Sequence, residues 1–429
     1  MQTRESEVQQ VWAGGAAAAA AAWPIIITRM APHRPAALVG WLSLAQLISW
    51  GSVFYLFGLL LEPVEQALGL SRAQASLAFS LALLAEGLLA WPVGRLIDRG
   101  HERAVMTGGS LLLALGLLLH SRVDSAAGFY AVWLLLGAGM AATLYPPVFA
   151  VVIRRYPQDF RRAIIVITFL GGLASTVFIP LSAWLIALLG WRAALLALAA
   201  LHLLVCAPLH AWILRAAPAP SAPARHAAAA PLRGHLRSAP FVLVGVFIVL
   251  FMGVTAALPP HLVSLLRGAG LAEAWVIAAP AAIGLLQVAG RLLLYFLEHR
   301  WDRHRVNRSV PTLIPLALLV LLLAPAGGAA QTAAVLLFVA LYGIGNGLLT
   351  IVKGTAVAEY VSRAHAASLN GALGLPMALA RAAAPWLLGL LWTPAAGYRS
   401  GLWVLLGLCG LGLLALARAQ RLARQEPLP

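Results

Sequence analysis

GRLIDRGHER, residues 94–103, is a short charged stretch between two long apolar segments. The segment before it, 75–97, and the segment after it, 104–119, each approach the ~20 apolar residues that a helix needs to cross a bilayer. Charge concentrated between two such segments is typical of a tight turn at a membrane surface. We therefore predict two membrane-spanning helices joined at this stretch.

Four residues of the stretch carry a recognisable pattern. Gly94 would let a neighbouring helix approach, and Asp98 could accept hydrogen bonds from the N-terminal amides of that helix. Arg99 and Arg103 would hold the turn on the cytoplasmic side. The pattern resembles the signature loop G-x-x-x-D-R-x-G-R-R of the major facilitator superfamily, a conformational-switch loop between its second and third helices. The second glycine falls one place early, and Glu102 replaces an expected basic residue.

The composition excludes an ordinary soluble domain. Hydrophobic residues make up 62% of the chain and charged residues 10%, with a mean hydropathy of +0.88, whereas soluble domains carry about 25% charged residues. A net charge of +16 could indicate nucleic acid, but the basic residues lie between apolar segments, so we expect no nucleic-acid partner. Cys206 and Cys409 lie inside apolar segments and predict neither a disulfide framework nor a metal site.

Apolar segments recur along the whole chain. We predict twelve membrane-spanning helices, at 37–61, 75–97, 104–120, 128–153, 163–188, 192–214, 240–265, 274–298, 309–324, 332–358, 368–392 and 400–417.

The spans fall into two groups of six. We predict an all-α membrane protein with an N-terminal half at 36–214 and a C-terminal half at 240–418. A Pro-, Ala- and Arg-rich cytoplasmic linker at 215–239 separates them. A flexible extension, 1–35, precedes the first half, and a cytoplasmic tail, 419–429, follows the second.

Short motifs repeat between the two halves. GWR at 190–192 recurs as GYR at 397–399, and GRL at 94–96 recurs at 290–292. The offsets are 207 and 196 residues, so the halves form a parallel repeat. The superfamily resemblance implies the same architecture, with a substrate site near the midplane between the halves.

Lysine and arginine predict the orientation. With the N-terminus inside, inner segments carry 23 of the 30 Lys and Arg residues and outer loops carry 5. Because basic residues favour the cytoplasmic side, we expect both termini in the cytoplasm. The predicted setting is the bacterial inner membrane, where the chain works as a monomer in contact with lipid.

Ionisable residues inside spans are functional candidates, because each costs at least ~2.5–3.5 kcal/mol at the helix centre. Four occur, namely Glu86, Arg291, Lys353 and Arg381. Three are basic and one is acidic, so a cavity that they line should attract an anion.

Arg381 lies deepest, near the middle of the span 368–392. We predict that it is the main contact for a substrate carboxylate, which a guanidinium can hold through two parallel hydrogen bonds. The alternative is a structural arginine tied to backbone carbonyls or to Glu86. Glu86 could carry a coupling proton, or it could be the counter-ion of Arg381 or Lys353.

Lys353 ends a polar stripe on the span 332–358. Tyr342 and Asn346 precede it at helical spacing, and a membrane helix with so many polar groups on one face is expected to meet water. We predict that these residues contact substrate. Alternatively, Lys353 snorkels to the inner surface.

The span 274–298 carries a second stripe, with Gln287 and Arg291 as predicted substrate contacts. Arg291 could instead pair with Glu298 or reach the inner surface. Gln46, on the first span, is a further predicted contact.

Two stretches refine the resemblance. Residues 46–55 and 345–354 resemble the oxalate/formate-antiporter and monocarboxylate-transporter branch of the superfamily. That resemblance implies basic residues on helices 8 and 11 that hold a carboxylate, and Arg291 and Arg381 match them by helix and depth. Related bacterial sequences often carry an acid where this chain has Pro146, which leaves the coupling mechanism open.

We therefore predict a secondary active transporter that moves a small organic anion, a carboxylate, by alternating access, coupled to protons or to a counter-substrate. A proton-coupled drug exporter of the same fold is the alternative, although it would need acids in the cavity. A membrane sensor is less well supported, because it would need a soluble output domain and neither predicted tail resembles one. The sequence contains no phosphate loop, metal-ligand spacing or nucleophile elbow, so we predict no enzyme and no cofactor.

Overall fold

The computed structural model describes residues 35–156, 160–215, 234–297, 303–325, 327–362 and 366–425. Across these ranges the regular structure is helical, and twelve spans are long and apolar enough to cross a membrane. The predicted twelve-helix fold is confirmed. The predicted extension and most of the predicted linker lie outside the described residues.

The N-terminal half contains six spans, several of them built from consecutive helical segments. They are α2 (Pro35–Ser49), η1 (Trp50–Tyr55) and α3 (Phe57–Leu68); α4 (Arg72–Asp98); α5 (Glu102–His120); α6 (Ala126–Thr143) and α7 (Tyr145–Arg155); α8 (Phe160–Gly172) and α9 (Ala174–Leu189); and α10 (Trp191–Leu201), η2 (His202–Cys206) and α11 (Ala207–Ile213).

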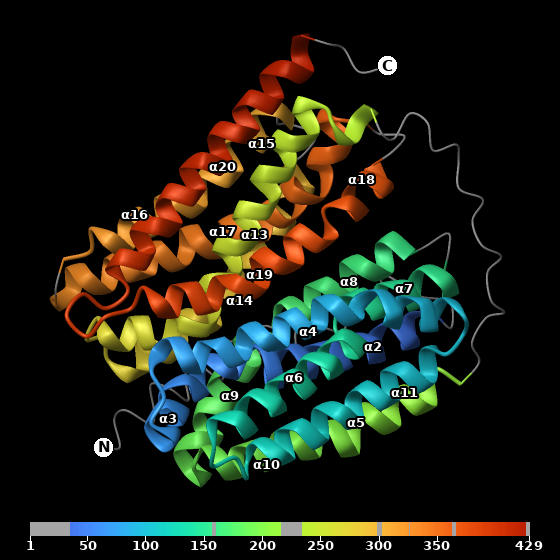
Figure 1. Ribbon diagram of the computed structural model, residues 1–429, viewed down its shortest axis with the longest axis vertical. Helices are drawn as coiled ribbons and strands as arrows, with labels where there is room; N and C mark the ends of the chain where they lie inside the picture. Colours follow the sequence, from blue (N-terminus) through green and yellow to red (C-terminus); the bar gives the residue numbers. More distant parts are fainter. Residues whose placement is uncertain are drawn as a thin grey trace.

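The C-terminal half follows the same scheme. Its spans are α13 (Ala239–Gly268); α14 (Glu273–Leu297); α15 (Arg303–Ser309), η4 (Val310–Thr312) and α16 (Leu313–Leu322); α17 (Gly328–Tyr360); α18 (Ala366–Ala372) and α19 (Gly374–Leu390); and α20 (Arg399–Gln425). Figure 1 shows this half, yellow to red, above the blue and green N-terminal half.

Equivalent helices pack closely in the two halves. Gly137 of α6 lies against α4, where a Cβ on it would come 2.3 Å from the carbonyl oxygen of Ala82. Gly343 of α17 lies against α14, where a Cβ would come 2.7 Å from Cβ of Leu286. The first pair joins the second and fourth spans, and the second pair joins the eighth and tenth. The repeat seen in the sequence therefore corresponds to repeated packing.

The first span is longer than predicted. It continues to Leu68 instead of ending at residue 61, through two acids that interrupt the apolar pattern. Glu62 pairs with Arg267, and Glu65 lies 2.7 Å from Arg72. Because both acids have cationic partners, the helix continues through them.

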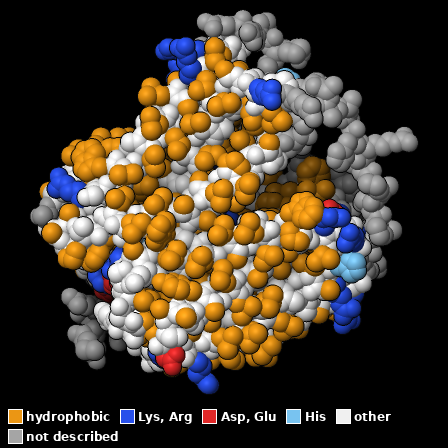
Figure 2. All heavy atoms as spheres, in the orientation of Figure 1, with side chains coloured by type: hydrophobic (Ala, Val, Ile, Leu, Met, Phe, Trp, Pro, Cys, Tyr) orange, Lys and Arg blue, Asp and Glu red, His pale blue; other side chains and the backbone are white. Residues whose placement is uncertain are grey.

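We call the end that carries residues 94–103 the inner end, following the predicted orientation, and the opposite end the outer end. At the outer end the halves touch: the Trp386 amide of α19 donates to Ser80 Oγ of α4 at 3.1 Å. At the inner end, no described atom beyond its own helix lies within 4 Å of a Cβ built on Gly94. Figure 2 shows the surface hollowed between the halves. The structure is thus closed at the outer end and open at the inner end around Gly94.

Candidate functional site

An ion pair joins the two halves between α4 and α19. Arg381 Nη1 donates to Glu86 Oε1 at 3.1 Å, and Arg381 Nη2 lies 2.9 Å from Glu86 Oε2. The Arg381 side chain is 24% exposed and the Glu86 side chain 6%. The guanidinium carbon also lies 5.9 Å from the ring centroid of Phe54, on the first span. Glu86 is therefore the counter-ion of Arg381 in this conformation.

Arg291 of α14 also faces the N-terminal half. Its Nη1 donates to the Thr168 carbonyl oxygen of α8 at 3.3 Å, and the Tyr55 and Tyr145 hydroxyls are close enough to interact with it electrostatically. Its Nε is buried and has no hydrogen-bond partner among the described residues. Glu298, the alternative partner, lies outside those residues. Within the part of the chain that the structure describes, Arg291 thus carries a charge that no acid neutralises.

Lys353 of α17 is the third cation. It is partly buried and lies near enough to Arg381 for the two charges to repel each other. It forms no ion pair with any described acid. Among the described residues, the intramembrane site therefore holds three cations and one acid, and that acid is paired with Arg381.

Aromatic rings form the N-terminal wall of the site. The ring centroid of Trp50 lies 4.9 Å from that of Phe54 and 5.0 Å from that of Tyr145, and Tyr145 stacks on Phe149 at 5.3 Å. The Tyr145 hydroxyl lies near Arg291. The wall offers apolar surface together with two polar groups, the Trp50 indole N–H, which is buried without a hydrogen-bond partner among the described residues, and the Tyr145 hydroxyl beside an unneutralised cation.

Gln46 stabilises a helix break in this conformation. It is fully buried, and its Nε2 donates to the Thr143 carbonyl oxygen at 2.5 Å. That carbonyl lacks its helical donor because Pro147, four residues later, has no N–H. Gln46 thereby stabilises the break between α6 and α7 and does not face the cations.

Tyr342 also donates to a carbonyl that a proline leaves without its helical donor, in the C-terminal half. It is 2% exposed, and its hydroxyl donates to the Thr255 carbonyl oxygen at 3.3 Å. Pro259 removes the helical donor of that carbonyl. Gln46 and Tyr342, two predicted substrate contacts, therefore each donate to a carbonyl that a proline leaves unpaired. The sequence alone does not reveal this role, because it does not show which helix each residue packs against.

Gln287 and Asn346 differ from Gln46 and Tyr342 in their surroundings. Both are partly exposed, on α14 and α17 respectively. Among the described residues, neither side chain has a hydrogen-bond partner in the structure. They remain predicted substrate contacts.

The predicted switch loop is solvated. Asp98, Arg99 and Arg103 are exposed, and within the described ranges Asp98 has no partner. The fully buried acid of the loop is Glu102, which accepts a hydrogen bond from Arg155 Nε at 2.6 Å and lies 3.9 Å from Arg154 Nε. The sequence analysis missed this role. An acid replacing a basic residue, with two arginines ending the fourth span, was the available clue.

A hydrogen-bond chain closes the outer end. Arg72 pairs with Glu65 at 2.7 Å and donates to the Tyr398 hydroxyl at 2.8 Å. His261 Nε2 lies 2.8 Å from the Pro385 carbonyl, which only accepts, so Nε2 carries the proton and Nδ1 accepts from Tyr398 at 3.0 Å. Burial raises the pKa of Tyr398 above its ordinary value and outweighs the nearby Arg72, so the hydroxyl keeps its proton.

We call these four residues, Glu65, Arg72, His261 and Tyr398, the outer latch. Glu65 and Arg72 belong to the N-terminal half, and His261 and Tyr398 to the C-terminal half. The sequence analysis did not find the latch.

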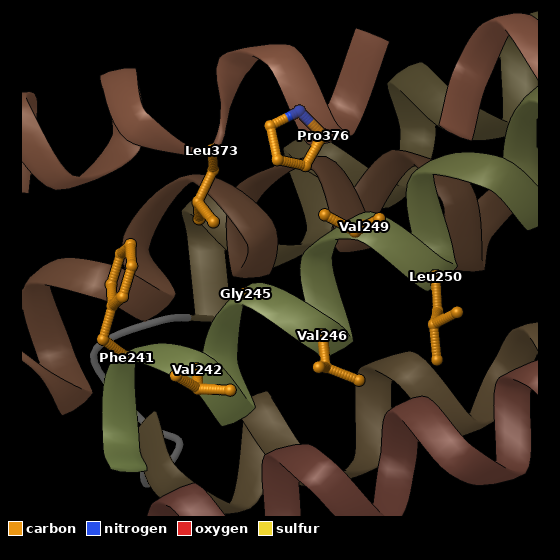
Figure 3. A pocket seen from close by; sticks show the side chains of 8 residues that line it. All are labelled: Phe241, Val242, Gly245, Val246, Val249, Leu250, Leu373 and Pro376. Carbon is orange, nitrogen blue, oxygen red and sulfur yellow. The ribbon is translucent and has the colours of Figure 1, made fainter. Parts of the chain in front are cut away.

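An apolar cavity lies outside the cationic site. It has a volume of about 280 Å³ and is shown in Figure 3, lined by Phe241, Val242, Gly245, Val246, Val249, Leu250, Leu373 and Pro376. No charged or hydrogen-bonding side chain lines it, so it is not part of the cationic site. Across the described ranges, no group of three His, Cys, Asp or Glu residues could hold a metal ion.

Residues 42–385 match the family model of the Major Facilitator Superfamily. The chain belongs to this superfamily. The matched region contains Glu86, Arg291, Lys353 and Arg381. Superfamily members and the relatives described below are transporters, so this superfamily protein is a transporter and not an enzyme.

Two curated relatives are monocarboxylate transporters. The chain is 32% identical over 308 residues to monocarboxylate transporter 13 of Bos taurus, covering 67% of this chain and 68% of that one. It is 37% identical over 124 residues to monocarboxylate transporter 13 of Rattus norvegicus, covering 28% of each.

Solved structures share the superfamily fold. The nucleoside transporter NupG superposes with a TM-score of 0.69 at 16% identity, covering 89% of this chain and 98% of that one. An inward-facing bacterial homologue of the human lysosomal transporter Spinster gives 0.69 at 15% identity, covering 92% and 98%. The twelve spans make the protein a multi-pass membrane protein, whereas the bacterial inner membrane and the cytoplasmic termini stay predictions.

Proposed function

We propose that this transporter carries a small organic carboxylate across the membrane by alternating access. The observation that supports it best is the charge of the site. Arg291 and Lys353 have no acid partner among the described residues, and Arg381 has one. Cations that face a low-dielectric site are costly without an anion. A substrate carboxylate would supply the missing negative charge.

The similarity to monocarboxylate transporter 13 supports the same substrate class. The aromatic wall around Trp50 and Tyr145 fits an organic anion, because it can pack the carbon skeleton while the cations hold the carboxylate.

The structure changes the ranking of the predicted contacts. Arg381 comes first by depth, but Glu86 already engages it. Arg291, with a buried Nε that lacks a partner, is the guanidinium available to an incoming carboxylate. We propose Arg291 as the first contact, with Arg381 and Lys353 as further anchors.

Alternating access requires the outer end to open and the inner end to close. The outer latch joins the halves in the present conformation. Asp98, which is exposed here, would bind the N-terminal end of the α18–α19 span once the inner end closes. Gly94 would permit that approach, and Arg99 and Arg103 would stay at the membrane surface.

A proton-coupled drug exporter is less well supported. Cationic drugs would need an acid free to bind them, and the one acid of the described site, Glu86, is paired with Arg381. Two unneutralised cations beside it would repel a cationic substrate.

Uptake by proteoliposomes tests the proposal. The substrates are radiolabelled lactate, pyruvate, oxalate and malonate, with tetraphenylphosphonium as the lipophilic cation. We expect uptake of at least one carboxylate, its loss in Arg291→Ala, and its retention in Arg122→Ala, which removes an exposed outer-loop arginine. Transport of tetraphenylphosphonium with no carboxylate uptake would overturn the proposal.

A further inference from the structure

We propose that the apolar cavity of Figure 3 binds one acyl chain of an anionic phospholipid from the inner leaflet, and that Arg237 and Arg418 hold the headgroup of that lipid. We call this cavity, lined by the eight residues that Figure 3 labels, the acyl groove. The lipid site is independent of the substrate that the protein carries.

The acyl groove opens at the surface of the C-terminal half. Val242 and Val246 of α13 line it and are 52% and 40% exposed. Leu373 and Pro376 of the α18–α19 span face α13 across it in Figure 3. Gly245 lies between these walls and has no side chain to fill the space; a Cβ there would come 3.0 Å from Leu373 Cδ2. The groove is therefore preformed, and a side chain at position 245 would narrow it.

The dimensions of the acyl groove fit one unbranched hydrocarbon chain. From Phe241 to Leu250 it follows α13 for about 14 Å at ~1.5 Å per residue, which is close to half of the ~30 Å hydrocarbon core. Its volume of about 280 Å³ over that length leaves a mean cross-section of about 20 Å², the width of about one row of packed carbon atoms. A helix of a partner protein, ~10 Å across, would not enter it. The occupant that fits is an acyl chain about one leaflet deep.

A second apolar cavity continues the acyl groove toward the outer end. It has a volume of about 170 Å³ and shares Val249 and Leu250 with the groove. Its other lining residues come from α13, α19 and α20 and include Gly253, Ala380 and Val404. An acyl chain longer than the groove can therefore continue between these three helices.

Arg237 lies at the inner end of the acyl groove. It is exposed, and it precedes Phe241, the first groove residue on α13, by four positions. Figure 2 shows basic side chains at the upper end of the C-terminal half, above a mainly hydrophobic surface. A phospholipid with its chain in the groove would place its headgroup at this end, because the groove reaches about one leaflet deep.

Arg418 of α20 lies near the same end. Gly412 packs against Phe251 of α13, and α20 runs from the outer to the inner end, so Arg418 lies about 9 Å closer to the inner end than that contact. It is exposed and follows Val404, which lines the second cavity, by about four helical turns. Arg418 thus shares a face of α20 with the cavity, and its long side chain can extend to the membrane surface.

The two arginines select the charge of the lipid. Among the described residues, neither Arg237 nor Arg418 has an ion-pair partner. Basic residues at the inner surface attract anionic headgroups, whereas a zwitterionic headgroup brings a positive charge of its own. Each arginine should contribute about fivefold in affinity for the anionic lipid, and the pair about 30-fold. The groove thereby selects an acyl chain and the arginines select a negative headgroup.

Native mass spectrometry tests the site. The purified full chain is stripped of lipid in detergent and titrated with palmitoyl-oleoyl phosphatidylglycerol or with the corresponding phosphatidylcholine. We expect one phosphatidylglycerol to bind about 30-fold more tightly than phosphatidylcholine. Equal affinities for the two lipids would overturn the proposal.

Variants separate the groove from its charged end. Val246→Trp fills the groove and should weaken phosphatidylglycerol binding by about tenfold or more, whereas Leu204→Trp, at an exposed position of η2, should not. Arg237→Gln combined with Arg418→Gln should remove the preference for phosphatidylglycerol, and Arg215→Gln, at an exposed position of the N-terminal half, should retain it. Equal losses in the two tryptophan variants, or a preference that persists without both arginines, would contradict the site.

A photoreactive lipid keeps the test valid if Val246→Trp fails to fold. Phosphatidylglycerol with a diazirine in its acyl chain is irradiated on the unaltered protein, and the adducts are mapped by peptide mass spectrometry. We expect adducts concentrated at 241–250 and 373–376, displaced by excess phosphatidylglycerol and much less by phosphatidylcholine. Adducts spread evenly over the membrane-facing helices would show that lipid contacts this face like any other, and would overturn the proposal.

Discussion

Replacing Tyr398 by phenylalanine is expected to open the outer end of the transporter. The Tyr398 hydroxyl accepts a hydrogen bond from Arg72 across the two halves, at 2.8 Å, and donates one to His261 within its own half. Arg72 keeps its pair with Glu65, since both belong to the N-terminal half. The substitution therefore removes one contact between the halves and preserves the charges of the outer latch.

The size of the effect follows from which contacts differ between conformations. The bond from Arg72 to Tyr398 exists only when the outer end is closed, whereas the bond from Tyr398 to His261 can persist in both states. A hydrogen bond to a charged group contributes roughly 1.5–3 kcal/mol. A loss of about 2 kcal/mol would shift the ratio of outer-open to outer-closed molecules by about 30-fold.

Pulsed electron paramagnetic resonance can measure this ratio. Spin labels attached through Ala67→Cys and Ala272→Cys would report the separation of the halves, because both positions are exposed at the outer end. The native Cys206 and Cys409 are buried and would be replaced by alanine. We expect a longer-distance population to grow in Tyr398→Phe.

Tyr360→Phe is the matched control. The Tyr360 hydroxyl accepts hydrogen bonds from Asn307 and Gln420, both within the C-terminal half, so its loss should leave the distance distribution unchanged. An unchanged distribution in Tyr398→Phe, or the same shift in both variants, would refute the assignment of the outer latch.

Four further predictions concern other residues of the loop and of the spans. Asp98→Asn should move the spin-label distribution toward the outer-closed state, because it weakens the contact expected when the inner end closes; an unchanged distribution would count against that contact. Arg291→Lys should raise the KM for the transported carboxylate by about 10–100-fold, since an ammonium cannot reproduce the guanidinium fork, and an unaltered KM would eliminate Arg291 as an anchor. Gln46→Leu and Tyr342→Phe should each reduce the free energy of unfolding by about 1–2 kcal/mol, measured by thermal unfolding, without altering KM. Unchanged stability with an altered KM would support their assignment as substrate contacts. Glu102→Gln should destabilise the protein by about 3–5 kcal/mol, seen as a lower Tm, because Arg155 loses the buried carboxylate that pairs with it, and an unaltered Tm would show that the Glu102–Arg155 pair adds no stability.

Much of the fold could be predicted from the sequence, because the signals are local. A membrane helix forms its own backbone hydrogen bonds and needs a continuous apolar segment, so composition alone locates the spans. The same logic identified Glu86, Arg291, Lys353 and Arg381, since any charge inside such a segment stands out. It failed at the end of the first span, where Glu62 and Glu65 looked like a helix end.

Which side chains pair with one another across different helices could not be predicted in this way. Glu86 and Arg381 lie 295 residues apart, and the sequence left open whether they meet. Gln46 and Tyr342 look like substrate contacts on their own helices, yet each donates to a carbonyl that a proline on another helix leaves unpaired. Hydropathy is a property of each segment by itself, so the sequence determined the spans and their charged residues. Which charge meets which depends on how helices distant in sequence cross, and only the tertiary structure decided that.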